Sequence, residues 1–246
     1  MAKQRKRKSK RSSRKNKPTH HVITKVTSPQ EYHDGADTFR AVQIVSYDIT
    51  DEPLEQPYTK DLPQQVIDEI SEIYHMLPKR PYQAIGRLLP LIDKYPNTPI
   101  LYNHLSVAYG YNDQPELAAE VVYKNYKNNP DYLFARLSYA ELCMHAGEYD
   151  KIPEIFDHKY DLKLLYPKRD VFHVSEVVNF MAIMGIYFYE IGDRETAELF
   201  YEPIKKMGRS FEATKALKKL LYPSLKQRLL LRILKFLENK AGTPPT

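Results

Sequence analysis

From Pro63 onward, apolar residues recur with the period of an α-helix. The first such block carries Val66, Ile67, Ile70, Ile73, Tyr74 and Leu77 on one helical face. An apolar residue at every third or fourth position is the pattern of an amphipathic helix, and similar blocks follow to the end of the chain. They are separated by turn-forming residues at Pro81, Tyr95-Pro96-Asn97, Asn112-Asp113, Asn129-Pro130-Asp131, Gly147, Gly192 and Tyr222-Pro223. The pattern predicts roughly ten short helices joined by short turns.

Before Pro63 the helical period is missing. Prolines interrupt residues 18–62 repeatedly, and only the stretch 41–47 alternates weakly between apolar and polar residues. A strand needs neighbouring strands for stability, and no partner strand is evident in the sequence. We therefore predict a Pro-containing extended linker over residues 18–62. Two alternatives stay open for residues 41–47: a short strand in a regular sheet, or an extended segment that lies on the helices.

The N-terminal tail, residues 1–17, is composed almost entirely of basic and polar residues. Such a composition cannot bury enough apolar surface to offset its ordering entropy, so the tail is predicted to be disordered. It would attract any polyanion through counterion release, although it lacks the interleaved aromatics for base stacking. A solubilising tail, a nucleic-acid or ribosome tether and a localisation signal remain open. Its bases are Lys3, Arg5, Lys6, Arg7, Lys8, Lys10, Arg11, Arg14, Lys15 and Lys17.

The net charge of +6 hides two basic ends around an acidic middle. The tail carries +10 and the residues after Ile204 carry +9, so residues 18–204 carry −13. A single cysteine excludes an intramolecular disulfide, and no run of apolar residues suits a signal peptide or a membrane span. We therefore expect a soluble cytoplasmic protein without an integral membrane span, or a nuclear one if the cell is eukaryotic.

Shifting the sequence by 34 residues aligns the helical blocks with one another. The shift pairs Ala84 with Ala118, Leu88 with Val122, and Tyr95-Pro96 with Asn129-Pro130. The next unit follows after 45 residues, an insertion of eleven, and pairs Ala140 with Gly185, Cys143 with Phe188, and Gly147-Glu148 with Gly192-Asp193. A repeat of about 34 residues built from two helices has the spacing of tetratricopeptide repeats.

The unit from Val178 resembles the tetratricopeptide repeat family most clearly. Its matching residues are Met184-Gly185, Phe188, Gly192-Asp193, Ala197, Tyr201 and Ile204, and the resemblance covers about residues 65–211. In this pattern Gly185 and Ala197 are small where two helices cross closely. Arg136, Ile152 and Pro153 depart from it, so a kinked or shortened third hairpin is expected at residues 132–158.

The resemblance implies an all-α fold. It would be a right-handed α-solenoid of antiparallel helix pairs over residues 63–240, with a C-terminal closing helix and a disordered N-terminal region. Residues 241–246 should be disordered. Related helix-pair solenoids remain an alternative.

The family binds its partners on the inner face of the first helices. By alignment this face carries Asn103, Val107, Tyr111, Phe134, Leu137, Glu141, His145, Asn179, Ala182, Ile186 and Glu190. None of these is Lys or Arg, so the clamp that binds an acidic chaperone C-terminus is not expected. The resemblance points to an apolar or mixed protein segment as partner, or to residues 40–60 of this chain folded back into the groove.

Catalytic chemistry has little support in the sequence. The glycines are scattered singly, which disfavours a phosphate-binding loop. The histidines are dispersed without the spacing of a metal site. Cys143 is open to a nucleophile interpretation but matches a packing position. We predict no catalytic, cofactor or metal residues; an enzyme with a dispersed active site is the rival class.

The predicted last helix, residues 225–240, is apolar on two faces. Such a helix should be buried on both, which suggests self-association, with binding to a membrane surface as the alternative. Together these features predict a non-enzymatic interaction adaptor or scaffold. The alternative is a nucleic-acid- or ribosome-associated protein tethered by its tail.

Overall fold

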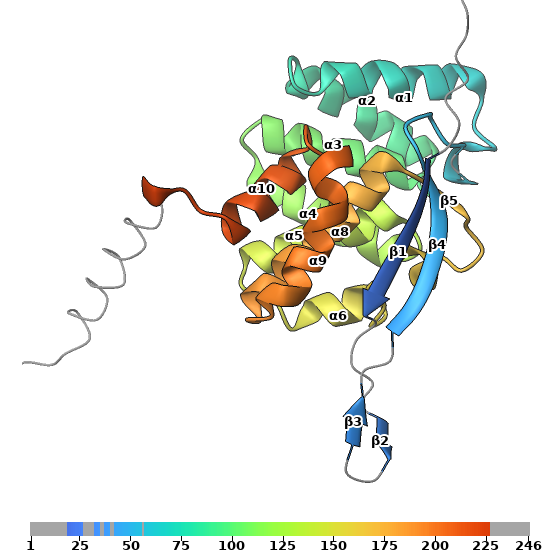
Figure 1. The fold of residues 1–246 in the computed structure, drawn as a ribbon. Helices are drawn as coiled ribbons and strands as arrows, with labels where there is room; N and C mark the ends of the chain where they lie inside the picture. The colour runs from blue at the N-terminus through green and yellow to red at the C-terminus, as the bar shows by residue number, and fades with distance from the viewer. Residues whose placement is uncertain (1–18, 27–31, 35–36, 40–41, 56, 227–246) are drawn as a thin grey trace, which may run out of the picture.

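A computed structural model describes the backbone of residues 19–26, 32–34, 37–39, 42–55 and 57–226, and the side chains from residue 46 onward. This part of the chain is predominantly helical (Figure 1). The basic tail, residues 241–246 and nearly all of the predicted helix at 225–240 lie outside it. The α-helices are α1 (Gln64–Met76), α2 (Pro81–Lys94), α3 (Pro99–Tyr111), α4 (Pro115–Asn128), α5 (Leu133–His145), α6 (Lys151–Ile155), α7 (Leu162–Leu165), α8 (Val174–Glu190), α9 (Arg194–Met207) and α10 (Glu212–Leu221).

The helix boundaries follow the predicted turn residues. Proline occupies the first position of α2, α3 and α4, where its missing N–H would have no helical partner and its fixed φ suits the helix. After α8 the chain reverses at Gly192, whose φ of +89° lies in the left-handed region that favours glycine. The predicted division into short helices is confirmed.

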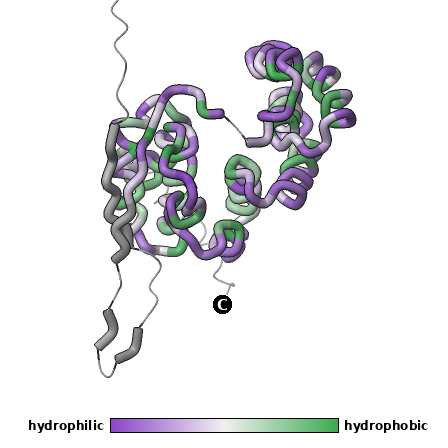
Figure 2. The backbone as a smooth tube through the Cα atoms, turned by 90° about the vertical axis from the view of Figure 1, so that its right-hand side faces the viewer, coloured by the Kyte–Doolittle hydropathy of each residue, from purple (hydrophilic) through white to green (hydrophobic). Residues whose placement is uncertain are grey.

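Consecutive helices pack as hairpins. The pairs are α1 with α2, α3 with α4, α5 with α6 and α8 with α9, and the first helices α1, α3, α5 and α8 contact each other in that order. Figure 2 shows hydrophobic and hydrophilic residues interspersed along the helical part of the chain. Helices α1, α2, α9 and α10 bury one face, whereas ten of the residues of α8 are buried. The helices build two core clusters, one over α1 to α3 and one over α5 to α10.

The third hairpin is shortened, as predicted from Pro153. Its second helix, α6, has only five residues. The residues after it, which include the insertion inferred from the repeat spacing, form α7 and a short strand, β5 (Val171–His173).

The chain is not all-α, because residues 42–50 form a strand with two partners. This strand, β4 (Val42–Thr50), pairs antiparallel with β1 (Thr19–Val26) and parallel with β5. Two further strands, β2 (Tyr32–Asp34) and β3 (Asp37–Phe39), pair with each other. Of the two alternatives left open for residues 41–47, the structure has the strand in a sheet. Neither partner strand was predicted: β1 falls within the segment assigned to the linker, and β5, about 120 residues after β4 inside the insertion, is too short to give a periodic signal.

Strand β4 is anchored to the helical body by its side chains. Tyr47 and Ile49 are buried in the same core cluster as α5 and α8, and the Tyr47 ring meets the Phe172 ring edge-on at 5.0 Å. The sheet lies on one side of the helical body and α10 on another (Figure 1). The N-terminal region therefore folds back onto the helices.

The predicted close helix crossing at Gly185 and Ala197 is confirmed. A Cβ atom added to Gly185 would lie 3.4 Å from the Ala197 carbonyl oxygen and 2.5 Å from a methyl group of Leu217 on α10. Real Cβ atoms do not approach other atoms as closely as the shorter distance. The contact with α9 is an ordinary van der Waals distance, so it is the close approach of Leu217 on α10 that the absence of a side chain at Gly185 permits.

Candidate functional site

A groove of about 1200 Å³ lies where the two core clusters meet. Its walls come from the first helices α1, α3 and α5, from the start of α8, and from the segment before α1. We call residues 53–55 and 57–60 of that segment the strap. The groove is lined by Pro53, Leu54, Glu55, Pro57, Thr59, Lys60, Ile67, Ile70, Ser71, Tyr74, Ile100, His104, Phe134, His173, Ser175 and Glu176.

The floor of the groove is mainly apolar. Ile67 and Ile70 come from α1, Ile100 from α3 and Phe134 from α5. The apolar surface of α1 is wider than the face that packs in the core. Ile70 lies on the packed face and is buried, whereas Tyr74 lies beside that face and is 59% exposed. Exposed apolar surface inside a concave site is typical of a binding surface.

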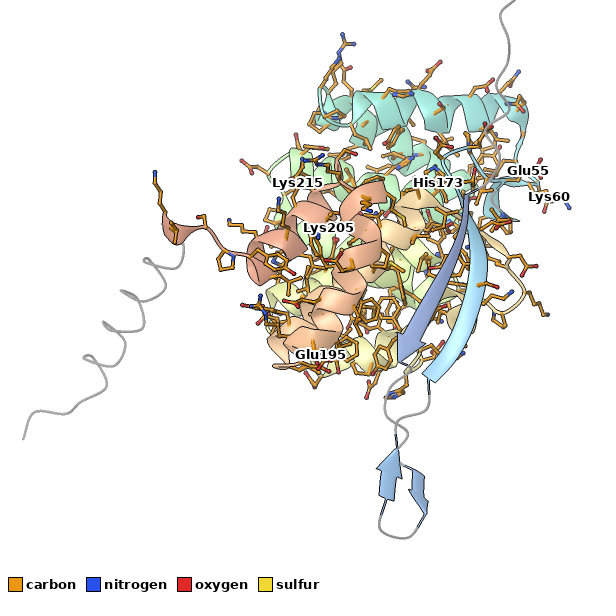
Figure 3. The ribbon with its side chains drawn as sticks, in the orientation of Figure 1. Glu55, Lys60, His173, Glu195, Lys205 and Lys215 are labelled. Atoms are coloured by element: carbon orange, nitrogen blue, oxygen red, sulfur yellow. The ribbon has the colours of Figure 1, made fainter. Side chains whose placement is uncertain are left out.

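The strap closes one side of the groove. It contains a short 3-10 helix, Pro57–Thr59, and the half-buried Tyr58 ring packs edge-on against Tyr132 at 5.3 Å. Glu55 and Lys60 are exposed and lie on the same side of the molecule as His173 (Figure 3). The strap belongs to the segment 40–60 that was expected to fold back into the partner groove, but the groove that it lines shares only Phe134 with the predicted inner face.

The polar end of the groove is held rigidly. Arg169 donates two hydrogen bonds to the Glu176 carboxylate, at 3.0 and 2.7 Å. The backbone N–H of His173 donates to the same carboxylate at 2.9 Å, which completes a capping box at the start of α8. Glu176 is buried, so these donors compensate its charge. Glu176 therefore fixes the start of α8 and is not a free catalytic base.

His104 lies in the groove wall with almost no solvent contact. Its side chain belongs to α3 and its ring centroid is 5.6 Å from that of Tyr74. Burial lowers the pKa of His104 to about 4, because a charged imidazolium would lose its hydration there. The groove therefore keeps a neutral imidazole at neutral pH.

We expect His104 to make the fold acid-sensitive. The unfolded chain binds a proton at His104 near pH 6.5, whereas the folded chain resists it down to about pH 4. The contribution of His104 to the free energy of unfolding is therefore fully present above about pH 6.5. It declines as the pH falls from there towards 4. Because of His104, the free energy of unfolding should be about 2 kcal/mol lower at pH 5 than at pH 7.

Urea denaturation at the two pH values checks this expectation. In the variant His104→Gln, the difference in the free energy of unfolding between pH 7 and pH 5 should be about 2 kcal/mol smaller than in wild type. This holds whatever the stability of the variant at pH 7. Asn103→Gln, an uncharged change beside His104 on α3, serves as the control and should keep the wild-type dependence. An unchanged pH dependence in His104→Gln would show that His104 is not held neutral.

The structure separates the eleven predicted inner-face residues into three groups. Phe134 lines the groove. Leu137 and Ala182 are only 3% and 0% exposed, which excludes them as partner contacts, because packing between α5, α8 and their neighbours covers them. The others are exposed or half-buried outside the groove lining: Asn103, Val107, Tyr111, Glu141, His145, Asn179, Ile186 and Glu190.

Most of the residues that line the groove were not predicted from the sequence. The alignment placed the partner surface on the middle and end of α3, α5 and α8, whereas the groove uses α1, the beginnings of α3, α5 and α8, and the strap. One feature of the sequence did indicate the groove. Ile67 and Tyr74 extend the apolar face of α1 beyond the stripe of Val66, Ile70, Ile73 and Leu77 that is buried.

Other candidate chemistry can be located in the described residues. Cys143 is buried, and burial raises the pKa of its thiol, which disfavours the reactive thiolate. Within the described ranges, no group of three or more His, Cys, Asp or Glu side chains could hold a metal ion. No helix in this part of the chain has the length and apolar character needed to cross a membrane.

Comparison with known proteins gives no match. No protein-family model matches the sequence, and neither a search of curated proteins nor a search of solved structures finds a significant similarity.

Proposed function

We propose that this chain is a non-enzymatic adaptor that binds a segment of another protein in the groove. The groove carries this proposal: it is concave, apolar on its floor and polar at its rim, and it lies between successive first helices. We further propose that the helical hairpins form a right-handed solenoid like that of tetratricopeptide repeats. The supporting observations are the repeat of about 34 residues and the order of helix contacts.

The groove suits an extended or helical peptide better than a small metabolite. Its volume of about 1200 Å³ exceeds the roughly 300–1000 Å³ that is usual for small-molecule sites. Its charged lining residues are few, and Glu176 is already paired with Arg169. A mainly apolar segment would bury the remaining exposed surface of Ile67, Ile100 and Phe134, while its polar groups meet Glu55, Lys60 and Ser71 at the rim.

Affinity capture from nuclease-treated lysate tests this function. Wild type is compared with the groove variant Ile67→Lys/Tyr74→Ser and with the matched control Leu89→Lys/Tyr82→Ser, whose changes fall on exposed side chains of α2. A protein retained by wild type and control but lost by the groove variant would support the proposal. If every retained protein bound all three versions equally, the groove would not be the binding site.

A second function is favoured by the tail. Its ten bases within seventeen residues would bind nucleic acid or a ribonucleoprotein without sequence preference and raise the local concentration of the groove there. We place this activity in the cytoplasm, or in the nucleus of a eukaryotic cell. Residues 225–240 remain our candidate for self-association.

A further inference from the structure

The positive charge of the folded region is concentrated at one end. Residues 205–226 contain seven Lys or Arg and one Glu, whereas residues 18–204 carry −13. Six of these bases come from the end of α9, the following turn and α10, and all six are exposed. We call them the basic face: Lys205, Lys206, Arg209, Lys215, Lys218 and Lys219.

The packing of α10 directs its lysines to solvent. Thr214, Leu217 and Leu221 are buried where α10 packs on α8 and α9. The lysines at 215, 218 and 219 are exposed, and their spacing of three and four residues makes them neighbours on the solvent-facing surface of the helix, beside the buried stripe. Figure 3 shows Lys205 and Lys215 over α9 and α10, well away from Glu55, Lys60 and His173 at the groove.

Most of this charge is not neutralised by neighbouring carboxylates. Lys205 pairs with Glu202 at 3.0 Å and Lys215 with Glu212 at 2.6 Å, and both pairs are solvent-exposed and therefore weak. Among the described residues, no ion pair involves Lys206, Arg209, Lys218 or Lys219. A polyanion could contact these four cations without displacing a protein carboxylate.

Helix stabilisation explains only part of the pattern. Lys205 and Lys206 lie in the last turn of α9, and Lys218 and Lys219 in the last turn of α10, where cations interact favourably with the helix dipole. That effect does not account for Arg209 in the turn or for Lys215 within α10. The helix dipole also does not explain why the charges at the ends of two adjacent helices lie near one another.

We propose that the basic face is a second binding site, for the phosphate backbone of single-stranded nucleic acid. Tyr222, at the end of α10, is 43% exposed and could stack on a base. A membrane surface fits less well, because an interfacial helix must offer its apolar side to lipid and that side of α10 is buried in the fold. The adaptor would then hold a protein segment and a nucleic acid at separate sites.

Fluorescence anisotropy with a 20-nucleotide polyuridylate RNA tests this site in the full chain. The variant Lys215→Gln/Lys218→Gln/Lys219→Gln should bind at least about tenfold more weakly near 0.1 M salt, and its logarithmic salt dependence should be shallower by about 2. The control Lys79→Gln/Lys94→Gln/Lys168→Gln removes the same charge from exposed positions outside both the face and the groove. Its affinity should change by less than about threefold, because distant charges are screened.

Lysine acetylation followed by mass spectrometry separates this site from the tail, which also binds polyanions. In wild-type protein, RNA should protect Lys215, Lys218 and Lys219 from acetylation, and should leave Lys79, Lys94 and Lys168 reactive. The proposal is overturned if RNA protects only tail lysines, or if both triple variants lose affinity equally. It is also overturned if anionic phosphatidylserine vesicles protect the basic face and RNA does not.

Discussion

Replacing Arg136 with alanine should lower the free energy of unfolding by about 3 to 5 kcal/mol, because two backbone carbonyl oxygens lose their donor, at about 1 to 3 kcal/mol each, and the packing of the side chain is lost as well. The Arg136 side chain is buried on α5. It donates hydrogen bonds to the carbonyl oxygen of Pro130, to that of Ile155 at 2.7 Å and to the Asp157 carboxylate at 3.0 Å. These acceptors lie before α5 and at the end of α6, so one side chain joins both ends of the shortened third hairpin.

Chemical denaturation of two companion variants separates the contributions at this site. Arg136→Met keeps much of the volume but leaves the carbonyl groups without their donors, and should cost about 2 kcal/mol. Asp157→Asn should cost less than about 1 kcal/mol, because the Asp157 side chain is 50% exposed. If Arg136→Ala and Arg136→Met both changed the stability by less than Asp157→Asn, the hydrogen bonds of Arg136 would not hold the hairpin together.

Replacing Phe172 with alanine should cost about 3 to 4 kcal/mol, the usual effect of removing a buried phenyl ring. Phe172 is 0% exposed. It lies opposite Ile49 in the pairing of β4 with β5 and packs against Tyr47, while the Arg169 guanidinium covers its ring at 4.3 Å. Loss of the ring should therefore loosen both β4 and the start of α8.

Hydrogen exchange identifies which part of the fold is loosened. The Asp48 amide, which donates to the Asp170 carbonyl oxygen at 2.8 Å, should exchange faster in Phe172→Ala, whereas amides within α3 should change little. The neighbouring change Val171→Ala affects a side chain that is 37% exposed and should alter stability by less than about 0.5 kcal/mol. Equal effects of the two changes would argue against a docked β4.

The helical part of the fold was predictable because its information is local. Proline at the starts of α2, α3 and α4 and glycine at 192 mark helix boundaries within a few residues of sequence. The shortened third hairpin was also predicted, from the departures at Arg136, Ile152 and Pro153. A proline alone does not fix the end of a helix here, because Pro90 and Pro203 lie inside α2 and α9. These features depend on backbone chemistry and need no knowledge of tertiary contacts.

The sheet and the groove depend on contacts between distant residues, which the sequence pattern does not encode. Strand β4 finds a partner in residues 171–173, a segment too short to be recognised as a strand. Leu137 and Ala182 followed the family pattern for a partner-binding face, but packing in the core covers them. The alignment could place residues on a helix, but it could not show which turns of that helix neighbouring elements cover.

Site-specific photo-cross-linking tests the central claim most directly, namely that the groove receives a segment of another protein. A benzophenone amino acid replaces Tyr74, which is 59% exposed in the groove, or in the control Tyr82, which is 77% exposed on α2. After irradiation in nuclease-treated lysate, position 74 should give a discrete adduct with another protein, and position 82 should not. Identical adducts from both positions, or a cross-link from position 74 only to the chain's own strap, would contradict the proposed function.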